Sequence, residues 1–250
     1  MRTVEGPGWK MIHGDCLDVL AAMPDKSVHV TLTDPPYEVE AHTEGRRQMT
    51  GSRGIAENPL TFAAIDSVDR FTAAAQFARV TTNRVLAFCQ AEAIAPWRDA
   101  LDAAGIPYRR AIPWCKPDAM PSLHGRWPGQ AWEAIVLAQH PSSPPCPVGG
   151  KSRIYEFMRC NNGKTPNLHQ TQKPLGLMVA MVEDFTDPGD IVLDPFMGSG
   201  TTAAVALQHG RQYMGCELNP DYQSLQQQHI AAATPAPAPA APQIDLFQAA

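Results

Sequence analysis

The sequence has 250 residues, 44% of them hydrophobic, and a formal net charge of −5 at pH 7. No run approaches the roughly 18 consecutive apolar residues of a membrane helix, and residues 1–10 lack the apolar core of a signal peptide, so we expect a cytoplasmic protein with one large core. The six cysteines include no C-x-x-C pair, which argues against a zinc ribbon or a disulfide framework, and we predict no metal site.

Short apolar runs alternate along the chain with amphipathic segments. The runs are rich in β-branched residues and are typical of buried parallel strands. The segments between them have helical periodicity, and two of them end at a glycine. The predicted strands cover residues 28–33, 84–89, 134–138, 191–194 and 212–217, and the predicted helices cover 71–80, 93–104 and 201–209. This order predicts an α/β fold with an open, doubly wound sheet.

The first predicted strand ends in Asp34-Pro35-Pro36-Tyr37. This tetrapeptide combines a carboxylate, a backbone fixed by two prolines with free carbonyls, and an aromatic face. Two prolines remove two backbone N–H donors, whereas a turn with a purely structural role needs only one proline. The group therefore suits a base that carries an amino group and is held edge-on by acceptors. An ordinary turn with an aromatic residue is the alternative for Tyr37.

A glycine-rich turn at residues 194–202 follows the fourth predicted strand. Gly198 and Gly200 permit close approach of a ligand to the backbone, and the start of the next helix favours an anion. Glu217 ends the following strand, where an acidic residue can accept both hydroxyl groups of a ribose. Ligands of such sheets bind beyond the carboxyl ends of the strands, so we expect this turn and Asp34 to face one cleft. The turn predicts a nucleotide-like cofactor, with simple packing as the alternative.

Positive charge is concentrated between residues 103 and 182, where nine basic and three acidic residues give a net charge of +6. DNA binding depends on lysines and arginines that neutralise phosphates. The distribution thus indicates a DNA-facing surface despite the acidic total, and a solvated surface of mixed sign is the alternative. We predict DNA contacts from Arg46, Arg47, Arg53, Lys116, Arg126, Lys151 and Arg153.

The motifs and their order resemble the β class of DNA amino-methyltransferases, in which D-P-P-Y precedes F-x-G-x-G. The resemblance runs from Met11 to about His229. Residues 13–20 resemble the segment before the family's catalytic strand, and residues 169–175 its H-x-T-Q-K-P element. The resemblance implies a Rossmann-like methyltransferase sheet with inserted DNA-recognition segments, and S-adenosylmethionine as cofactor. It implies cofactor contacts from Asp15 at the adenine, Cys16, Asp34, Lys173 near the methionine end, Asp194, Pro195, Phe196, Gly198, Ser199, Gly200, Thr201, Thr202 and Glu217 at the ribose.

The resemblance also implies the chemistry. The exocyclic amino nitrogen of adenine or cytosine is a poor nucleophile, because its lone pair is delocalised into the ring. The Asp34 carboxylate and the Pro35 carbonyl would accept its two hydrogens and favour the pyramidal nitrogen that attacks the sulfonium methyl group, without a covalent enzyme intermediate. Tyr37 would stack on the flipped base. We predict catalytic roles for Asp34, Pro35, Pro36 and Tyr37 in double-stranded DNA methylation, with adenine favoured over the cytosine amino group.

Two segments depart from the alternating pattern. Residues 141–167 are rich in proline, glycine and asparagine, and we predict an irregular insertion on the DNA-facing side, within recognition elements at about 40–166. Residues 231–242 are almost entirely alanine and proline. This composition predicts a linker between a methyltransferase domain at 1–230 and a tail at 243–250.

The tail resembles the Q-L-[SD]-L-F pentapeptide by which bacterial replication and repair proteins dock on the DNA sliding clamp. Gln243 would supply a polar anchor, and Leu246 and Phe247 would fill an apolar pocket. The linker would then act as a tether. A disordered end without function is the alternative.

Three other functions compete with this interpretation. A nicotinamide-dependent oxidoreductase could use residues 198–203 as a G-x-G-x-x-G turn, but it leaves the Asp34 tetrapeptide unexplained. A non-catalytic DNA-binding accessory needs neither Tyr37 nor Glu217. RNA or protein amide methylation is disfavoured, because families with a related tetrapeptide usually place the cofactor motif first. We therefore predict a bacterial or phage DNA adenine methyltransferase that acts at the nucleoid, and a homodimer is compatible with its class.

Overall fold

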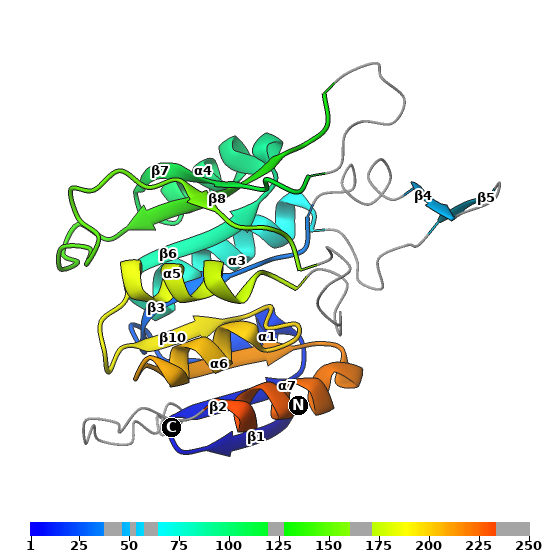
Figure 1. Ribbon diagram of the computed structural model, residues 1–250. Helices are drawn as coiled ribbons and strands as arrows, with labels where there is room; N and C mark the ends of the chain where they lie inside the picture. Colours follow the sequence, from blue (N-terminus) through cyan, green and yellow to red (C-terminus); the bar gives the residue numbers. More distant parts are fainter. Residues whose placement is uncertain (38–46, 51–53, 58–64, 120–127, 161–171, 234–250) are drawn as a thin grey trace.

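A nine-stranded mixed sheet forms the centre of the computed structural model, which describes residues 1–37, 47–50, 54–57, 65–119, 128–160 and 172–233 (Figure 1). The strand order is β1-β2-β11-β10-β3-β6-β8-β7-β9. The bounds are β1 (Arg2–Gly6), β2 (Trp9–His13), β3 (Val28–Thr33), β6 (Thr81–Cys89), β7 (Tyr108–Cys115), β8 (Trp132–Gln139), β9 (Tyr155–Glu156), β10 (Ile191–Asp194) and β11 (Gln212–Glu217). A separate antiparallel pair comprises β4 (Arg47–Thr50) and β5 (Gly54–Glu57).

Five neighbouring strands, β2, β11, β10, β3 and β6, run parallel to one another. All five therefore end on the same side of the molecule, which we call the carboxyl end of the sheet. The strands β3, β10 and β11 have the bounds that the apolar runs predict. The α/β class and the open sheet are thus confirmed.

The direction of β8 differs from the prediction. The run at 134–138 is a buried strand, but it pairs antiparallel with β6 on one side and antiparallel with β7 on the other. Alternation and burial carry no information on direction, because a buried strand has the same pattern whichever way it runs. As a consequence, β8 begins at the carboxyl end of the sheet and leaves at the opposite end.

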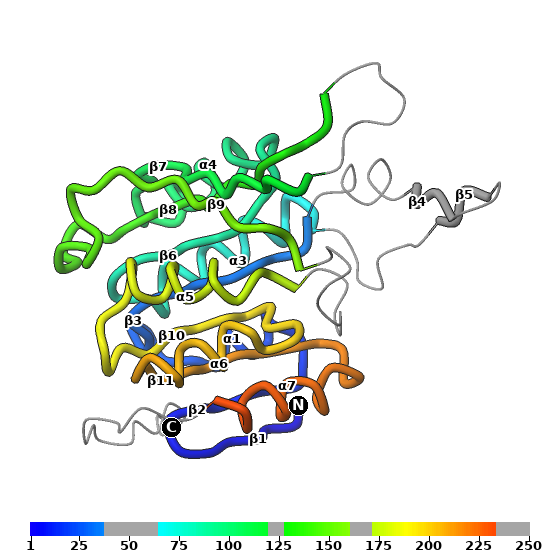
Figure 2. The backbone as a smooth tube through the Cα atoms, in the orientation of Figure 1, coloured from blue at the N-terminus to red at the C-terminus, as the bar shows by residue number. Residues whose placement is uncertain are grey.

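This reversal also places the predicted insertion. The chain after β8 packs against the start of β6, where Ser143 Oγ donates a 2.5 Å hydrogen bond to Asn83 O and Arg84 Nη2 donates a 2.8 Å bond to Pro144 O. The first part of the insertion therefore lies away from the carboxyl end of the sheet, and its position on the DNA-facing side stays a prediction. Figure 2 shows this loop opposite the end at which β3 finishes.

Helices cover both faces of the sheet. On one face, Leu20, Phe77 and Trp97 enter a core with the strands; on the other, Met181, Val205 and Ile230 do so. The first face carries α1 (Cys16–Ala22), α3 (Ser67–Val80) and α4 (Ile94–Ala103), and the second carries α5 (Leu175–Phe185), α6 (Thr201–Gln208) and α7 (Gln223–Ala232). Two short 3-10 turns, η1 (Ala91–Ala93) and η2 (Pro220–Tyr222), precede α4 and α7.

The helix bounds differ from the predicted ones mainly at their starts. The helix α3 begins four residues before the predicted start at 71, because the Asp66 side chain accepts a 2.8 Å hydrogen bond from Asp69 N and caps it. The last helix continues to Ala232, and the buried Ala233 follows it. The predicted linker at 231–242 therefore begins later, after Ala233. Among the described residues, no helix is both long and apolar enough to cross a membrane.

Candidate functional site

The carboxyl ends of β3 and β10 are adjacent, and they bring the two sequence motifs together. Leu193 lies opposite Thr31 in the parallel register. Beyond this pair, Thr33 Oγ1 donates a 2.8 Å hydrogen bond to Asp194 Oδ1 in a buried position. Asp34, the next residue along the chain, thus stands beside the glycine-rich turn. The structure unites the two motifs on one side of the molecule.

The glycine-rich turn has the backbone that the motif requires. Gly198 has φ of 48° and Gly200 has φ of 80°, values that side chains disfavour. Gly200 caps the start of α6, and a Cβ atom there would lie 3.4 Å from the Cα atom of Gln226. Glu217 Oε2 accepts a 2.9 Å bond from Gly198 N, so the carboxylate at the end of β11 holds the turn in place.

Two acidic groups at this turn have raised pKa values. Burial raises the pKa of Asp194 to about 7, although hydrogen bonds from Thr202 and Thr33 oppose the shift. Burial also raises the pKa of Glu217. Acids whose pKa values are shifted by burial often mark functional sites. The turn, the start of α6 and these carboxylates fit a nucleoside cofactor with an amino acid end.

Asp15 and Cys16 lie one strand further along the sheet. Asp15 Oδ1 accepts a 2.8 Å hydrogen bond from Leu17 N and caps α1, and Gly14 N donates to Glu217 O at 3.0 Å. The backbone bond places the segment that contains Asp15 beside the end of β11, and the adenine and ribose contacts of Asp15 and Glu217 stay predictions. Burial raises the pKa of the Cys16 thiol to about 12, which keeps it neutral. Among the described residues, no group of metal-ligating side chains occurs.

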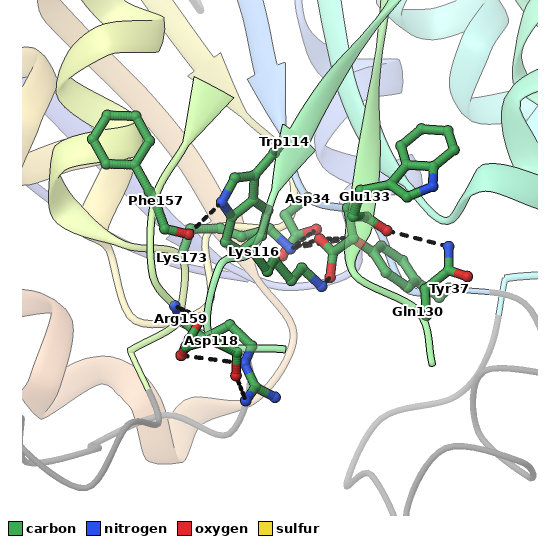
Figure 3. A network of polar contacts seen from close by, with 11 residues as sticks. Asp34, Tyr37, Trp114, Lys116, Asp118, Gln130, Glu133, Phe157, Arg159 and Lys173 are labelled. Carbon is green, nitrogen blue, oxygen red and sulfur yellow. Dashed lines mark hydrogen bonds and ion pairs between the residues drawn. The ribbon is translucent and has the colours of Figure 1, made fainter. Parts of the chain in front are cut away.

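A network of charged groups surrounds the Asp34 tetrapeptide (Figure 3). Lys173 Nζ lies 2.9 Å from Asp34 Oδ1 and 3.1 Å from Glu133 Oε2. Tyr37 donates its hydroxyl hydrogen to Glu133 Oε2 at 2.7 Å, and Lys116 binds the other oxygen of Glu133. Four charges of alternating sign therefore converge where the base is expected.

The network sets the protonation of its members. Burial raises the pKa of Asp34, the Lys173 ammonium opposes this shift, and Glu133 adds to it. Burial favours the neutral form of Glu133 as well, but Lys173 and Lys116 outweigh it and lower the pKa of Glu133 to about 2. Burial lowers the pKa of Lys173, whereas Asp34 and Glu133 raise it by more. Glu133 and Lys173 are therefore charged near neutral pH.

Three aromatic rings line the network around the Lys173 ammonium. Its Nζ atom lies 5.0 Å from the centre of the Phe88 ring, 5.3 Å from that of Tyr37 and 5.6 Å from that of Trp114. These distances permit cation–π attraction. Trp114 is itself fixed, because its Nε1 donates a 2.9 Å hydrogen bond to Phe157 O. The rings give the site a largely apolar wall beside Asp34.

The structure does not bring all predicted residues together. Lys173 contacts Asp34, whereas the resemblance implied a place near the methionine end of the cofactor. Arg153 pairs with Asp184 through two bonds of 2.7 and 2.8 Å near the end of α5, and Lys151 lies in the same segment, far from the carboxyl end of the sheet. Their predicted DNA contacts have no support from this position. Outside the described residues or side chains lie Arg46, Arg47, Arg53, Arg126, residues 169–171, Gln243, Leu246 and Phe247.

Glu133 is the residue that the sequence analysis missed. It precedes the apolar run at 134–138 and has no motif around it. Its importance depends on the reversed direction of β8, which places the first residues of that strand beside Asp34. The feature of the sequence that could have identified Glu133 is its negative charge within a mostly basic stretch.

Comparisons with known proteins agree with this geometry. The family described as DNA methylase matches residues 28–228. The chain is 31% identical over 240 residues to the putative methylase YubD of Escherichia coli strain K12, covering 89% of the chain and 90% of that protein. It is 27% identical over 260 residues to the type II methyltransferase M.XycI of Xanthomonas campestris pv. cyanopsidis, with 87% and 86% covered.

Solved structures show the same fold at lower identity. The M1.HpyAVI–SAM complex matches with a TM-score of 0.68 and 23% identity, covering 89% of this chain and 98% of the other. PvuII DNA methyltransferase, described as cytosine-N4-specific, matches with a TM-score of 0.67 and 17% identity, covering 89% and 86%.

Proposed function

The chain belongs to the DNA methylase family and is an S-adenosylmethionine-dependent DNA amino-methyltransferase, and from this premise we propose that it methylates the amino group of adenine after flipping the base out of the duplex. The observation that carries the proposal is the placement of Asp34 and Tyr37 beside the glycine-rich turn, through the hydrogen bond between Thr33 and Asp194. Membership in this family also leaves no place for the oxidoreductase alternative.

The cofactor supplies an electrophilic methyl group on a sulfonium. The protein's part is to hold the attacking nitrogen. Asp34 accepts one hydrogen of the amino group, and the Pro35 carbonyl, to which no described residue donates a hydrogen bond, accepts the other. Two acceptors localise the lone pair on nitrogen and orient it for in-line attack. A base inside the duplex cannot reach this corner, so the base must leave the stack.

The Tyr37 ring supports the flipped base in this proposal. Its hydroxyl is tied to Glu133, so the ring has a fixed orientation next to Asp34. Stacking on an aromatic ring contributes about 1–3 kcal/mol per base, which is comparable with the few kcal/mol that unstacking costs. A fluorescent base analogue at the target position is expected to brighten on binding of wild-type protein and less on binding of Tyr37→Ala.

Adenine is the favoured target because an aspartate, rather than a serine, begins the tetrapeptide. Cytosine-amino enzymes also use D-P-P-Y, so the cytosine amino group is the second candidate. Sequencing DNA from cells that express the protein tests both at once: N6-methyladenine at one short site supports the proposal, and N4-methylcytosine supports the second candidate. It also reports the recognition sequence.

Transfer of tritiated methyl groups to duplex DNA tests catalysis itself. Asp34→Ala is expected to abolish transfer while calorimetry shows nearly intact binding of S-adenosylmethionine. Equal loss of both would mean that Asp34 is structural. Wild-type protein that binds DNA without transfer would instead support the accessory function.

Clamp docking by the tail is a second part of the proposal, and it rests on the sequence of residues 243–247. The linker that remains after Ala233 has roughly nine residues and would span about 28 Å if fully extended. Deletion of residues 243–247 is expected to remove binding to the sliding clamp in a pull-down and to leave methylation of free oligonucleotides unchanged. Clamp binding that survives the deletion contradicts this part.

A further inference from the structure

Glu133 uses both carboxylate oxygens to connect the groups around Asp34. Its Oε2 accepts the Tyr37 hydroxyl at 2.7 Å and lies 3.1 Å from Lys173 Nζ, while Oε1 binds Lys116. Glu133 does not contact Asp34 through a hydrogen bond of its own. It therefore influences Asp34 through the lysine that the two acids share.

The shared lysine determines which oxygen of Asp34 is free for a ligand. Lys173 Nζ lies 2.9 Å from Asp34 Oδ1, and this oxygen is buried. The Asp34 side chain as a whole is 25% exposed, so Oδ2 is the oxygen that the target amino group can reach. Rotation of the carboxylate would break the contact with Lys173, and the contact of Lys173 with Glu133 restrains that movement.

We propose that Glu133 is a positioning residue for methyl transfer: it anchors Lys173 against Oδ1 of Asp34 and the Tyr37 hydroxyl beside it, so that carboxylate and ring are oriented before the base arrives. The inference rests on the proposed function, since it assigns Asp34 and Tyr37 to the target base. Fixed acceptors lower the barrier because they need no reorientation during the reaction.

Burial of the charged Glu133 side chain lowers stability, and a role in catalysis would explain why it is buried. Its side chain is only 15% exposed, and a buried ion network often contributes less to stability than apolar side chains of similar size. A second cluster, in which an acid also joins a tyrosine to a basic residue, offers a comparison: Asp184, 14% exposed, accepts the Tyr155 hydroxyl at 2.6 Å and pairs with Arg153. Asp184 lies at the opposite end of α5 from Lys173, and Tyr155 reaches it from β9, which pairs with the end of β7.

The experiment compares Glu133→Gln with Asp184→Asn in the full chain. Each change keeps the shape and a hydrogen-bond acceptor for the tyrosine but removes the charge. Both variants are expected to lose similar stability in urea unfolding. Only Glu133→Gln is expected to lower kcat, by roughly tenfold to a hundredfold, at saturating DNA and cofactor, with the Kd of S-adenosylmethionine unchanged within about twofold.

The pH profile of kcat gives a readout that a purely structural role would not change. Glu133 raises the pKa of Asp34 and also holds the Lys173 ammonium that lowers it, so the acid limb of kcat is expected to move in Glu133→Gln and to stay in place in Asp184→Asn. If Glu133→Gln fails to fold, Tyr37→Phe replaces it, and a fall in kcat of about threefold to tenfold is expected.

Each outcome decides the matter. Unchanged kcat in Glu133→Gln, or equal losses of kcat in both variants, overturns the inference and leaves the proposed function intact. Where Tyr37→Phe is tested instead, unchanged kcat in that variant overturns the inference and leaves the proposed function intact. Wild-type protein that transfers no methyl group overturns the proposed function and, with it, the inference.

Discussion

Thr33 and Asp194, which lie 161 positions apart in the chain, share a buried hydrogen bond of 2.8 Å. The bond joins the ends of β3 and β10, so it connects the residue that precedes Asp34 to the first residue of the glycine-rich turn. Asp194 also receives a hydrogen bond from Thr202 and one of 3.3 Å from Phe196 N. The base side and the cofactor side of the site thus depend on one carboxylate.

Replacement of Thr33 by valine should therefore affect the cofactor. Valine preserves the size of the side chain but leaves the buried Asp194 with one donor fewer, which costs about 1–3 kcal/mol. The expected result is weaker binding of S-adenosylmethionine, by about threefold to tenfold, measured by calorimetry, together with lower stability.

Thr31→Val is the matched control. Thr31 lies two residues earlier on β3, and its hydroxyl shares a buried 2.7 Å hydrogen bond with that of Thr81. It should cost about 1 kcal/mol of stability and leave cofactor affinity unchanged. Equal losses of affinity in both variants would show that the Thr33 effect is transmitted by general destabilisation.

The raised pKa of Asp194 predicts how stability depends on pH. Burial raises this pKa to about 7 from 3.8, so between these values the folded protein keeps a proton that the unfolded chain releases. Asp194 therefore lowers the free energy of unfolding progressively as pH rises through this window. Asp194→Asn should be more stable than wild type at about pH 8, by on the order of 2 kcal/mol, with a smaller gain at about pH 5.

Urea unfolding of both proteins at the two pH values measures this difference, and calorimetry should show that Asp194→Asn binds S-adenosylmethionine more weakly. The substitution would then raise the free energy of unfolding and weaken cofactor binding at the same time. A gain of the same size at both pH values would show that Asp194 has an ordinary pKa in the folded protein.

Much of the sheet was predictable, because local composition determines where buried strands begin and end. Runs of β-branched residues between charged and turn residues correctly predicted the bounds of β3, β10 and β11. The direction of β8 was not predictable, since it depends on pairing with β6 and β7. One reversed strand then moved Lys151 and Arg153 to the far end and brought Glu133 to the site.

The site was predictable where a motif is contiguous in sequence. Asp34 and Tyr37 lie three residues apart, and the glycine-rich turn is also a single short segment. Glu133 and Lys173 join them from other elements, and no local pattern reports such contacts. The position of Lys173 was assigned to the cofactor by resemblance, whereas its ion pair with Asp34 follows from the course of the chain before α5.

Removal of the Lys173 charge should move the acid limb of kcat to higher pH. The Lys173 ammonium lowers the pKa of Asp34 against burial and against Glu133, so in Lys173→Gln the carboxylate takes up its proton at higher pH. Asp34 must be ionised to accept the amino hydrogen. Relative to wild type, kcat of the variant should be lower at about pH 6 than at about pH 8.5.

The rates are measured at saturating S-adenosylmethionine, so that any change in cofactor affinity does not enter. Lys116→Gln serves as control, because Lys116 pairs with Glu133 and not directly with Asp34 in the part of the chain that the structure describes; its acid limb should move less. An acid limb that moves to lower pH in Lys173→Gln would contradict the inference that the Lys173 ammonium keeps Asp34 ionised.

Two glycines with similar backbones separate the cost of conformation from the role of the turn. Gly200 has φ of 80° and Gly189 has φ of 91°, and alanine in this region costs about 1–2 kcal/mol. A Cβ atom at Gly200 meets the Cα atom of Gln226 at 3.4 Å, whereas one at Gly189 has no atom within 4 Å. Both alanine variants should lose stability, and Gly200→Ala alone should bind S-adenosylmethionine at least about tenfold more weakly. Calorimetry measures this difference. Normal affinity in Gly200→Ala would mean that the cofactor does not approach the backbone at this turn, because the added methyl group would not disturb cofactor binding.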